Sequence, residues 1–125
     1  MTNSERFEVI HVPPGYESLG RVLQAALMQA AQGKGHERHA NGLPFDKQPM
    51  QTINREHGSV DGFLFQARKK SVEAKGLPFG RAQAEVLGAI NYLAGMHIAL
   101  DTWAAGTLPV AVPDKTPTRV DLLAP

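Results

Sequence analysis

The segment GKGHERHANGLPFDKQPM, residues 33–50, concentrates side chains that are able to bind an anion. Lys34 and Arg38 are positively charged, and His36 and His39 add imidazole donors within the same short stretch. Charged donors of these types form short hydrogen bonds to phosphate, and arginine can bind two phosphate oxygens at once. The glycines on both sides of Lys34 let backbone N–H groups converge on the same anion. The segment therefore predicts a phosphate-binding loop.

Residues that follow the loop extend this interpretation to a nucleotide-like ligand. Phe45 offers an aromatic face for a base, and Asn41 and Gln48 offer polar contacts to a base or sugar. Three basic residues on later helices complete the anion site if those helices face the loop. The predicted ligand-binding residues are Lys34, His36, Arg38, His39, Asn41, Phe45, Gln48, Arg55, Arg68 and Lys69.

The same residues admit plainer interpretations. A glycine that ends a helix, followed by a solvated polar loop, accounts for residues 33–41 without any ligand. A basic run such as residues 68–70 is commonly a solvated helix face. The glycine and lysine spacing of a P-loop is absent from the segment. A phosphate site and an ordinary exposed loop thus both remain open.

Metal and covalent chemistry receive less support from the sequence. His36 and His39 are three residues apart, and they would need Asp46 and His57 to converge on them to hold a metal ion. His97 and Asp101, four residues apart, favour a structural pair near the end of a helix. No serine or threonine lies in a recognisable nucleophile setting. We predict no metal, no cofactor and no catalytic residues.

Composition limits the range of functions. The chain has 125 residues, which suit one domain, and no cysteine, which excludes disulfides and thiolate metal sites. A net charge of +1 argues against a nucleic-acid binder. The charge is uneven, because residues 34–81 hold nine Lys/Arg and five Asp/Glu, a balance of +4. The middle of the chain is therefore the part that attracts anions.

Hydrophobic periodicity predicts an all-α fold, a small helical bundle. One helix is expected from Ser18 to Gly33, a short helix around residues 50–56, and another over residues 60–75. In the last of these the apolar positions are expected inward and the basic positions largely outward. The inward set is Phe63, Leu64, Ala67 and Ala74, and the outward set is Arg68, Lys69, Lys70 and Lys75.

The longest helix is expected over Gly80–Ala105, and its apolar centre predicts burial on several sides. Small residues and one asparagine recur on one stripe of this helix, at Ala84, Gly88, Asn91 and Gly95. Such a stripe lets another helix approach closely, either a helix of the same chain or one of a second copy, and a buried asparagine can fix the register of a helix pair. We therefore predict that this helix mediates a homo-oligomer.

The two ends of the chain have different patterns. Residues 7–12, FEVIHV, predict a short extended arm before Pro13, and residues 107–125 are rich in proline and predict an extended tail. The predicted organisation is a helical domain over residues 1–106 followed by this tail. The start of the sequence lacks the apolar core of a signal peptide, and no segment has the length of a membrane span. We expect a cytoplasmic protein with no membrane contact.

Residues 33–101 resemble small, mostly uncharacterised accessory proteins of tailed phages and prophages. The motifs that carry the resemblance are GKGHERHANG, FDKQPM, QARKKSVEA and EVLGAINYLAG. It implies a setting in a bacterial host, where such proteins commonly act on nucleotide pools or block host defence. All-α nucleotide pyrophosphohydrolases are similar in their short helices, but they need paired Glu-x-x-Glu motifs. Here that motif occurs only as Glu5 and Glu8.

Three functions follow from these observations. The first is a binding protein whose basic loop holds a phosphate-bearing small molecule, such as a nucleotide messenger that a phage sequesters. The second is a nucleotide hydrolase that uses Glu73 or Glu85 with the histidines. The third is an inhibitor that docks on a host protein through the loop and tail. The excess of donors over paired carboxylates favours binding over turnover.

Overall fold

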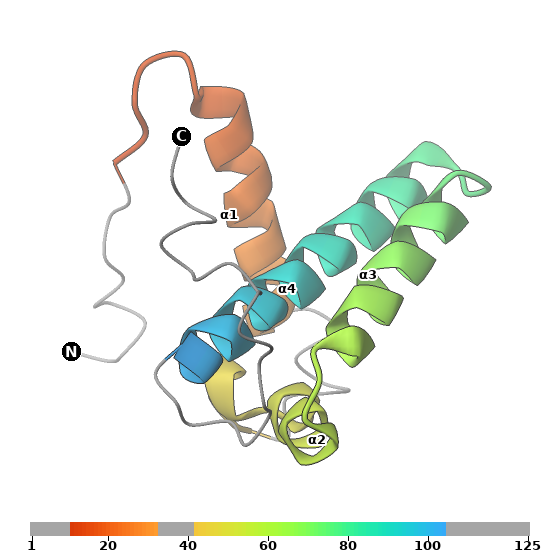
Figure 1. Ribbon diagram of the computed structural model, residues 1–125. Coiled ribbons are helices and arrows are strands. Elements are labelled where there is room, and N and C mark those ends of the chain that lie inside the picture. The colour runs from red at the N-terminus through yellow and green to blue at the C-terminus, as the bar shows by residue number, and fades with distance from the viewer. Residues whose placement is uncertain (1–10, 33–41, 105–125) are drawn as a thin grey trace, which may run out of the picture.

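The computed structural model of the chain describes residues 11–32 and 42–104, without the side chains of residues 103 and 104. This part of the chain is all-α, as the sequence predicts, and contains no strand (Figure 1). Its elements in chain order are α1 (Glu17–Gln32), the 3₁₀ turn η3 (Phe45–Lys47), α2 (Pro49–His57), α3 (Asp61–Ala74) and α4 (Phe79–Ala104).

Prolines mark where three of the described elements, η3, α2 and α4, begin. The sequence GLPF occurs twice, and in both copies the proline directly precedes a helical element, Pro44 before η3 and Pro78 before α4. The carbonyl oxygens of these prolines accept the first backbone bonds, from Lys47 at 2.9 Å and from Ala82 at 2.8 Å. Pro49 opens α2 in the same way, because the fixed φ of proline suits a first helical turn.

The antiparallel pair of α3 and α4 forms the core (Figure 1). Phe63 of α3 is only 1% exposed and packs directly on the backbone of α4 at Gly95. A Cβ at Gly95 would lie 2.7 Å from Cε1 of Phe63, so only glycine leaves room for the ring. Ala67 and Ala74 of α3 are also buried, as the sequence predicts.

Two expectations for α3 are wrong. Leu64, predicted inward, is 40% exposed, and Lys70, predicted outward, lies against α4. The Lys70 side chain passes Gly88, where a Cβ would be 3.0 Å from its Cδ. It forms an ion pair with Glu85 at 3.6 Å, and its Nζ lies 5.9 Å from the ring centre of Tyr92. The periodicity of α3 thus misplaces one apolar and one basic residue of this helix.

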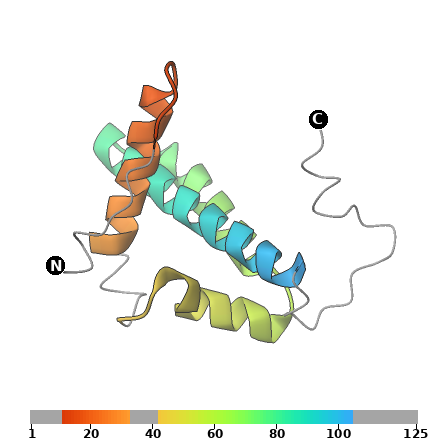
Figure 2. The ribbon, with the colours of Figure 1, turned by 90° about the vertical axis from the view of Figure 1, so that its left-hand side faces the viewer.

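α1 crosses α4 on another side (Figure 2). Two side-chain amides join the helices: Asn91 Nδ2 donates to the Ala26 carbonyl at 2.9 Å, and Gln29 Nε2 donates to the Ala84 carbonyl at 3.0 Å. Ala26, 2% exposed, lies at the crossing. The sequence correctly singles out Asn91 as a residue that bonds across a helix pair. Its partner, however, is a helix of the same chain.

The stripe of small residues on α4 is therefore filled from within the chain. α1 bonds at Ala84 and Asn91, whereas α3 covers Gly88 and Gly95. The stripe provides close approach, as predicted, and much of it is used by helices of the same chain, although Ala84 itself is exposed. The homo-oligomer stays a prediction that needs another surface of α4.

Candidate functional site

An apolar groove of about 520 Å³ lies where α1, α4 and the segment around η3 meet. Its main walls are Leu23 and Leu27 of α1, Ile90 and Ile98 of α4, and Leu43 and Phe45 beside η3. α1 crosses α4 at this point, and Ala26 is the residue of α1 that is buried. Leu23 remains 50% exposed and Leu27 38% exposed. A volume of this size is typical of small-molecule sites.

Two amide side chains place polar atoms on the groove. Gln48 is only 9% exposed, and its Nε2 donates to the Leu43 carbonyl at 3.1 Å. Asn91 uses its Nδ2 for the Ala26 carbonyl. Both residues line the groove, and the side-chain oxygen of each accepts no hydrogen bond from the described part of the chain. The groove thus combines apolar walls with two hydrogen-bond acceptors.

The groove adjoins both ends of the basic loop. Ala30 and Ala31, at the end of α1, line it, and so does Leu43, directly after Gly42. Residues 33–41 connect these two ends. The predicted residues Lys34, His36, Arg38, His39 and Asn41 themselves lie outside the described residues.

The structure brings together only some of the predicted site residues that it describes. Phe45 and Gln48 line the groove. Arg68 and Lys69 are exposed on α3 and line neither the groove nor the smaller pocket described next. In that part, the helices do not gather the basic residues around Phe45.

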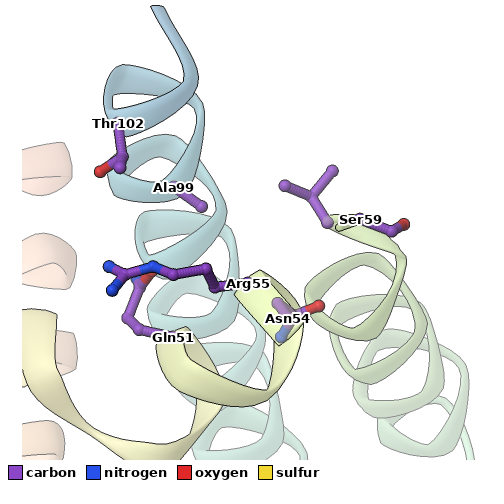
Figure 3. Close-up of a pocket in the computed structure, with 7 residues that line it drawn as sticks. Gln51, Asn54, Arg55, Ser59, Ala99 and Thr102 are labelled. Atoms are coloured by element: carbon purple, nitrogen blue, oxygen red, sulfur yellow. The ribbon is translucent and has the colours of Figure 1, made fainter. Parts of the chain in front are cut away.

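Arg55 belongs to a second, much smaller pocket of about 10 Å³ between α2, the start of α3 and α4 (Figure 3). That volume holds about one water molecule. Its polar walls are engaged in structure: Gln51 Nε2 donates to the Gly95 carbonyl at 2.9 Å, and Asn54 Oδ1 accepts from the Gly62 N–H at 3.1 Å. This pocket fastens α2 to its neighbours and is too small for a nucleotide.

The acidic and histidine residues considered for catalysis or metal binding are either paired with another side chain or far from one another. Glu85 pairs with Lys70, and His97 Nδ1 lies 3.8 Å from Asp101 Oδ2, which confirms the predicted pair on the last helix. Glu73 is exposed on α3. Over residues 11–32 and 42–104, no three His, Asp or Glu side chains are close enough to hold a metal ion. Burial raises the pKa of the Tyr92 phenol above its usual value.

One apolar stripe of α4 remains uncovered. Val86, Leu93 and Leu100 follow one another at intervals of seven residues, and they are 44%, 49% and 42% exposed. Seven-residue spacing places side chains on one face of a helix. The sequence of α4 is apolar on all sides. In the structure, two of these sides face α1 and α3, and the third carries the partly exposed stripe.

Over the described residues, the chain is thus a small all-α protein with an apolar groove between crossing helices and a partly exposed apolar stripe on its longest helix. Comparison with protein-family models, with curated proteins and with solved structures gives no match. Among the helices that the structure describes, none combines the length and hydrophobicity of a membrane span.

Proposed function

We propose that this chain is a binding protein that holds a phosphate-bearing, nucleotide-like ligand at the groove and the basic loop. One observation carries the proposal: an apolar groove with an aromatic residue adjoins both ends of a loop whose sequence is rich in cationic donors. The phosphates bind to Lys34, His36, Arg38 and His39, and the base lies in the groove against Phe45. Asn41 and Gln48 supply polar contacts.

The exposed basic residues take a secondary role in this proposal. Arg55, Arg68 and Lys69 lie on helices away from the groove, and they raise the local positive potential without touching the ligand. Fixed charges near a site raise the local concentration of an anion and its rate of association. Sequestering a nucleotide messenger against a host defence is the role that the resemblance to phage accessory proteins suggests.

Binding without turnover is the simpler chemistry for these residues. Glu85, a candidate acid or base for a hydrolase, is held in the ion pair with Lys70 on the α3 side of α4. The groove lies on the α1 side of the same helix. A carboxylate that is paired on another face cannot reach a ligand that lies in the groove.

The proposal includes a homo-oligomer formed through α4. Val86, Leu93 and Leu100 form an uncharged stripe that lies outside the groove residues. The same stripe on a second copy matches it in spacing and character, which is what a two-fold symmetric helix pair requires. The stripe thus replaces the small-residue positions as the contact surface.

Calorimetry with linear and cyclic nucleotides tests the binding proposal. Arg38→Ala should leave the melting temperature nearly unchanged and weaken binding about tenfold, because a charge-assisted hydrogen bond contributes about 1.5–3 kcal/mol. Arg81→Ala, an exposed arginine at the start of α4, is the matched control. Binding should weaken as salt rises. No heat with any nucleotide would overturn the proposal, and release of a hydrolysed product would favour the hydrolase.

A further inference from the structure

Gln48 and Asn91, two polar side chains that line the groove, each use the amide nitrogen in a hydrogen bond but not the amide oxygen. In Gln48 and in Asn91 the amide nitrogen donates to a backbone carbonyl, of Leu43 at 3.1 Å and of Ala26 at 2.9 Å. A carbonyl oxygen accepts only from a donor, so these bonds fix which end of each amide is nitrogen. The side-chain oxygens Oε1 of Gln48 and Oδ1 of Asn91 are then the acceptors left without a partner in the described part of the chain.

These acceptors constrain what can fill the groove. The principal walls are aliphatic or aromatic, from Leu23, Leu27, Ile90 and Ile98 to Phe45. A ligand that covers the amide oxygens with an apolar or acceptor edge leaves them buried and unpaired, which costs free energy. A ligand that presents N–H groups gives these oxygens the hydrogen bonds that they lack within the described part of the chain. The groove therefore selects for donors.

We infer that the groove recognises a nucleobase by its exocyclic amino group, as found in adenine, guanine and cytosine. This inference rests on the proposed function, since the phosphates of the same ligand occupy the loop. An amino group carries two hydrogens, the same number as the unpaired amide oxygens on the groove. When a carbonyl replaces the amino group, as in hypoxanthine or uracil, a single ring N–H remains as donor and the carbonyl oxygen opposes an acceptor.

Matched nucleotide pairs test the inference directly. ATP and ITP differ by an amino group against a carbonyl, as do CTP and UTP, whereas GTP differs from ITP by an added amino group. In each pair that binds, calorimetry should show that the nucleotide with the amino group has at least about tenfold higher affinity than the other nucleotide. A site built around a hydrogen bond discriminates strongly against the analogue that lacks it. Equal affinities within every binding pair would overturn the inference.

A pair of variants ties the preference to the groove. Asn91→Leu should reduce the preference for ATP over ITP to less than about threefold, because one of the two acceptors is gone. Gln29→Leu is the matched control, since it removes the other amide bond between α1 and α4, and Gln29 does not line the groove. The control should keep the full preference. If Asn91→Leu fails to fold, Gln48→Leu serves the same purpose with the same expected result.

The outcomes also separate this inference from the proposed function. Equal binding of ATP and ITP that weakens with salt and with Arg38→Ala supports the phosphate site and overturns the base preference. Adenosine binding more tightly than inosine, with no added affinity from phosphates, supports the base preference and overturns the phosphate site. If no nucleotide and no nucleoside binds, both are overturned.

Discussion

α3 and α1 both pack on α4, but the two contacts differ in depth and in chemistry. α3 meets α4 through Phe63, which is almost fully buried over Gly95, and through the paired Lys70 and Glu85. α1 crosses α4 with Ala26 at the contact and leaves Leu23 half exposed beside an open groove. A helix of 16 residues is stable mainly through packing of its apolar face. In the described part of the chain, the α3 contact thus buries a large aromatic side chain, whereas the α1 contact buries an alanine and leaves neighbouring leucines of α1 partly exposed.

The first test removes the main buried side chain of the contact between α3 and α4. Phe63→Ala removes the most buried large side chain and should lower the free energy of unfolding by about 3–5 kcal/mol. Urea denaturation followed by circular dichroism measures the change. Phe65→Ala, at a position 63% exposed on the same helix, is the control and should cost about 1 kcal/mol or less. Similar losses in both variants would show that α3 is not anchored by Phe63.

A second test addresses the open stripe of α4. Leu93→Lys places a charge at the centre of the proposed contact with a second copy and should weaken assembly by at least about 2 kcal/mol, because central apolar residues dominate such interfaces. Light scattering at micromolar concentration reports the subunit count. Val72→Lys, an exposed position on α3, should leave that count unchanged. A wild-type monomer would exclude the homo-oligomer altogether.

A third test sharpens the role of charge in the α3 contact. The Lys70 and Glu85 side chains are 27% and 29% exposed, so their ion pair is only partly screened. Lys70→Met keeps the aliphatic stem over Gly88 and removes the charge. The expected loss is about 0.5–1 kcal/mol, and high salt should shrink the difference from the wild type in urea denaturation. A larger loss would mean that the charge, more than the stem, holds the pair.

Local sequence patterns predict the helices well and the contacts between them only in part. Prolines and glycines set the helix bounds, and residues such as Phe63 and Ala67 are recognisable as inward positions. The predictions for Leu64 and Lys70 are wrong because periodicity gives the direction of an apolar face but not how much of that face the neighbouring helix covers. The glycines of α4 that make room for Phe63 and Lys70 lie far along the chain.

The candidate site shows the same limit. Phe45 and Gln48 are predictable because they follow an unusual loop in sequence, and both line the groove. Leu27 and Ile98 could not be predicted as groove residues, because an apolar residue on a helix has the same sequence pattern whether it faces a core or a groove. The oxygen that Asn91 presents depends on its bond to Ala26, a residue 65 positions away. Only the crossing of α1 over α4 brings these groups together.

The smallest expected effect on stability lies on the α1 side of the comparison. Leu23→Ala removes a wall of the groove that is 50% exposed, so little buried area is lost and the free energy of unfolding should fall by about 1 kcal/mol or less. The same change should weaken nucleotide binding several-fold, because the base loses an apolar contact. Denaturation and calorimetry on one preparation measure both effects. Leu64→Ala, 40% exposed on α3, is the control that should match its stability change without affecting binding. A loss as large as that of Phe63→Ala would mean that α1 belongs to the core, and the groove would then be a packing defect instead of a site.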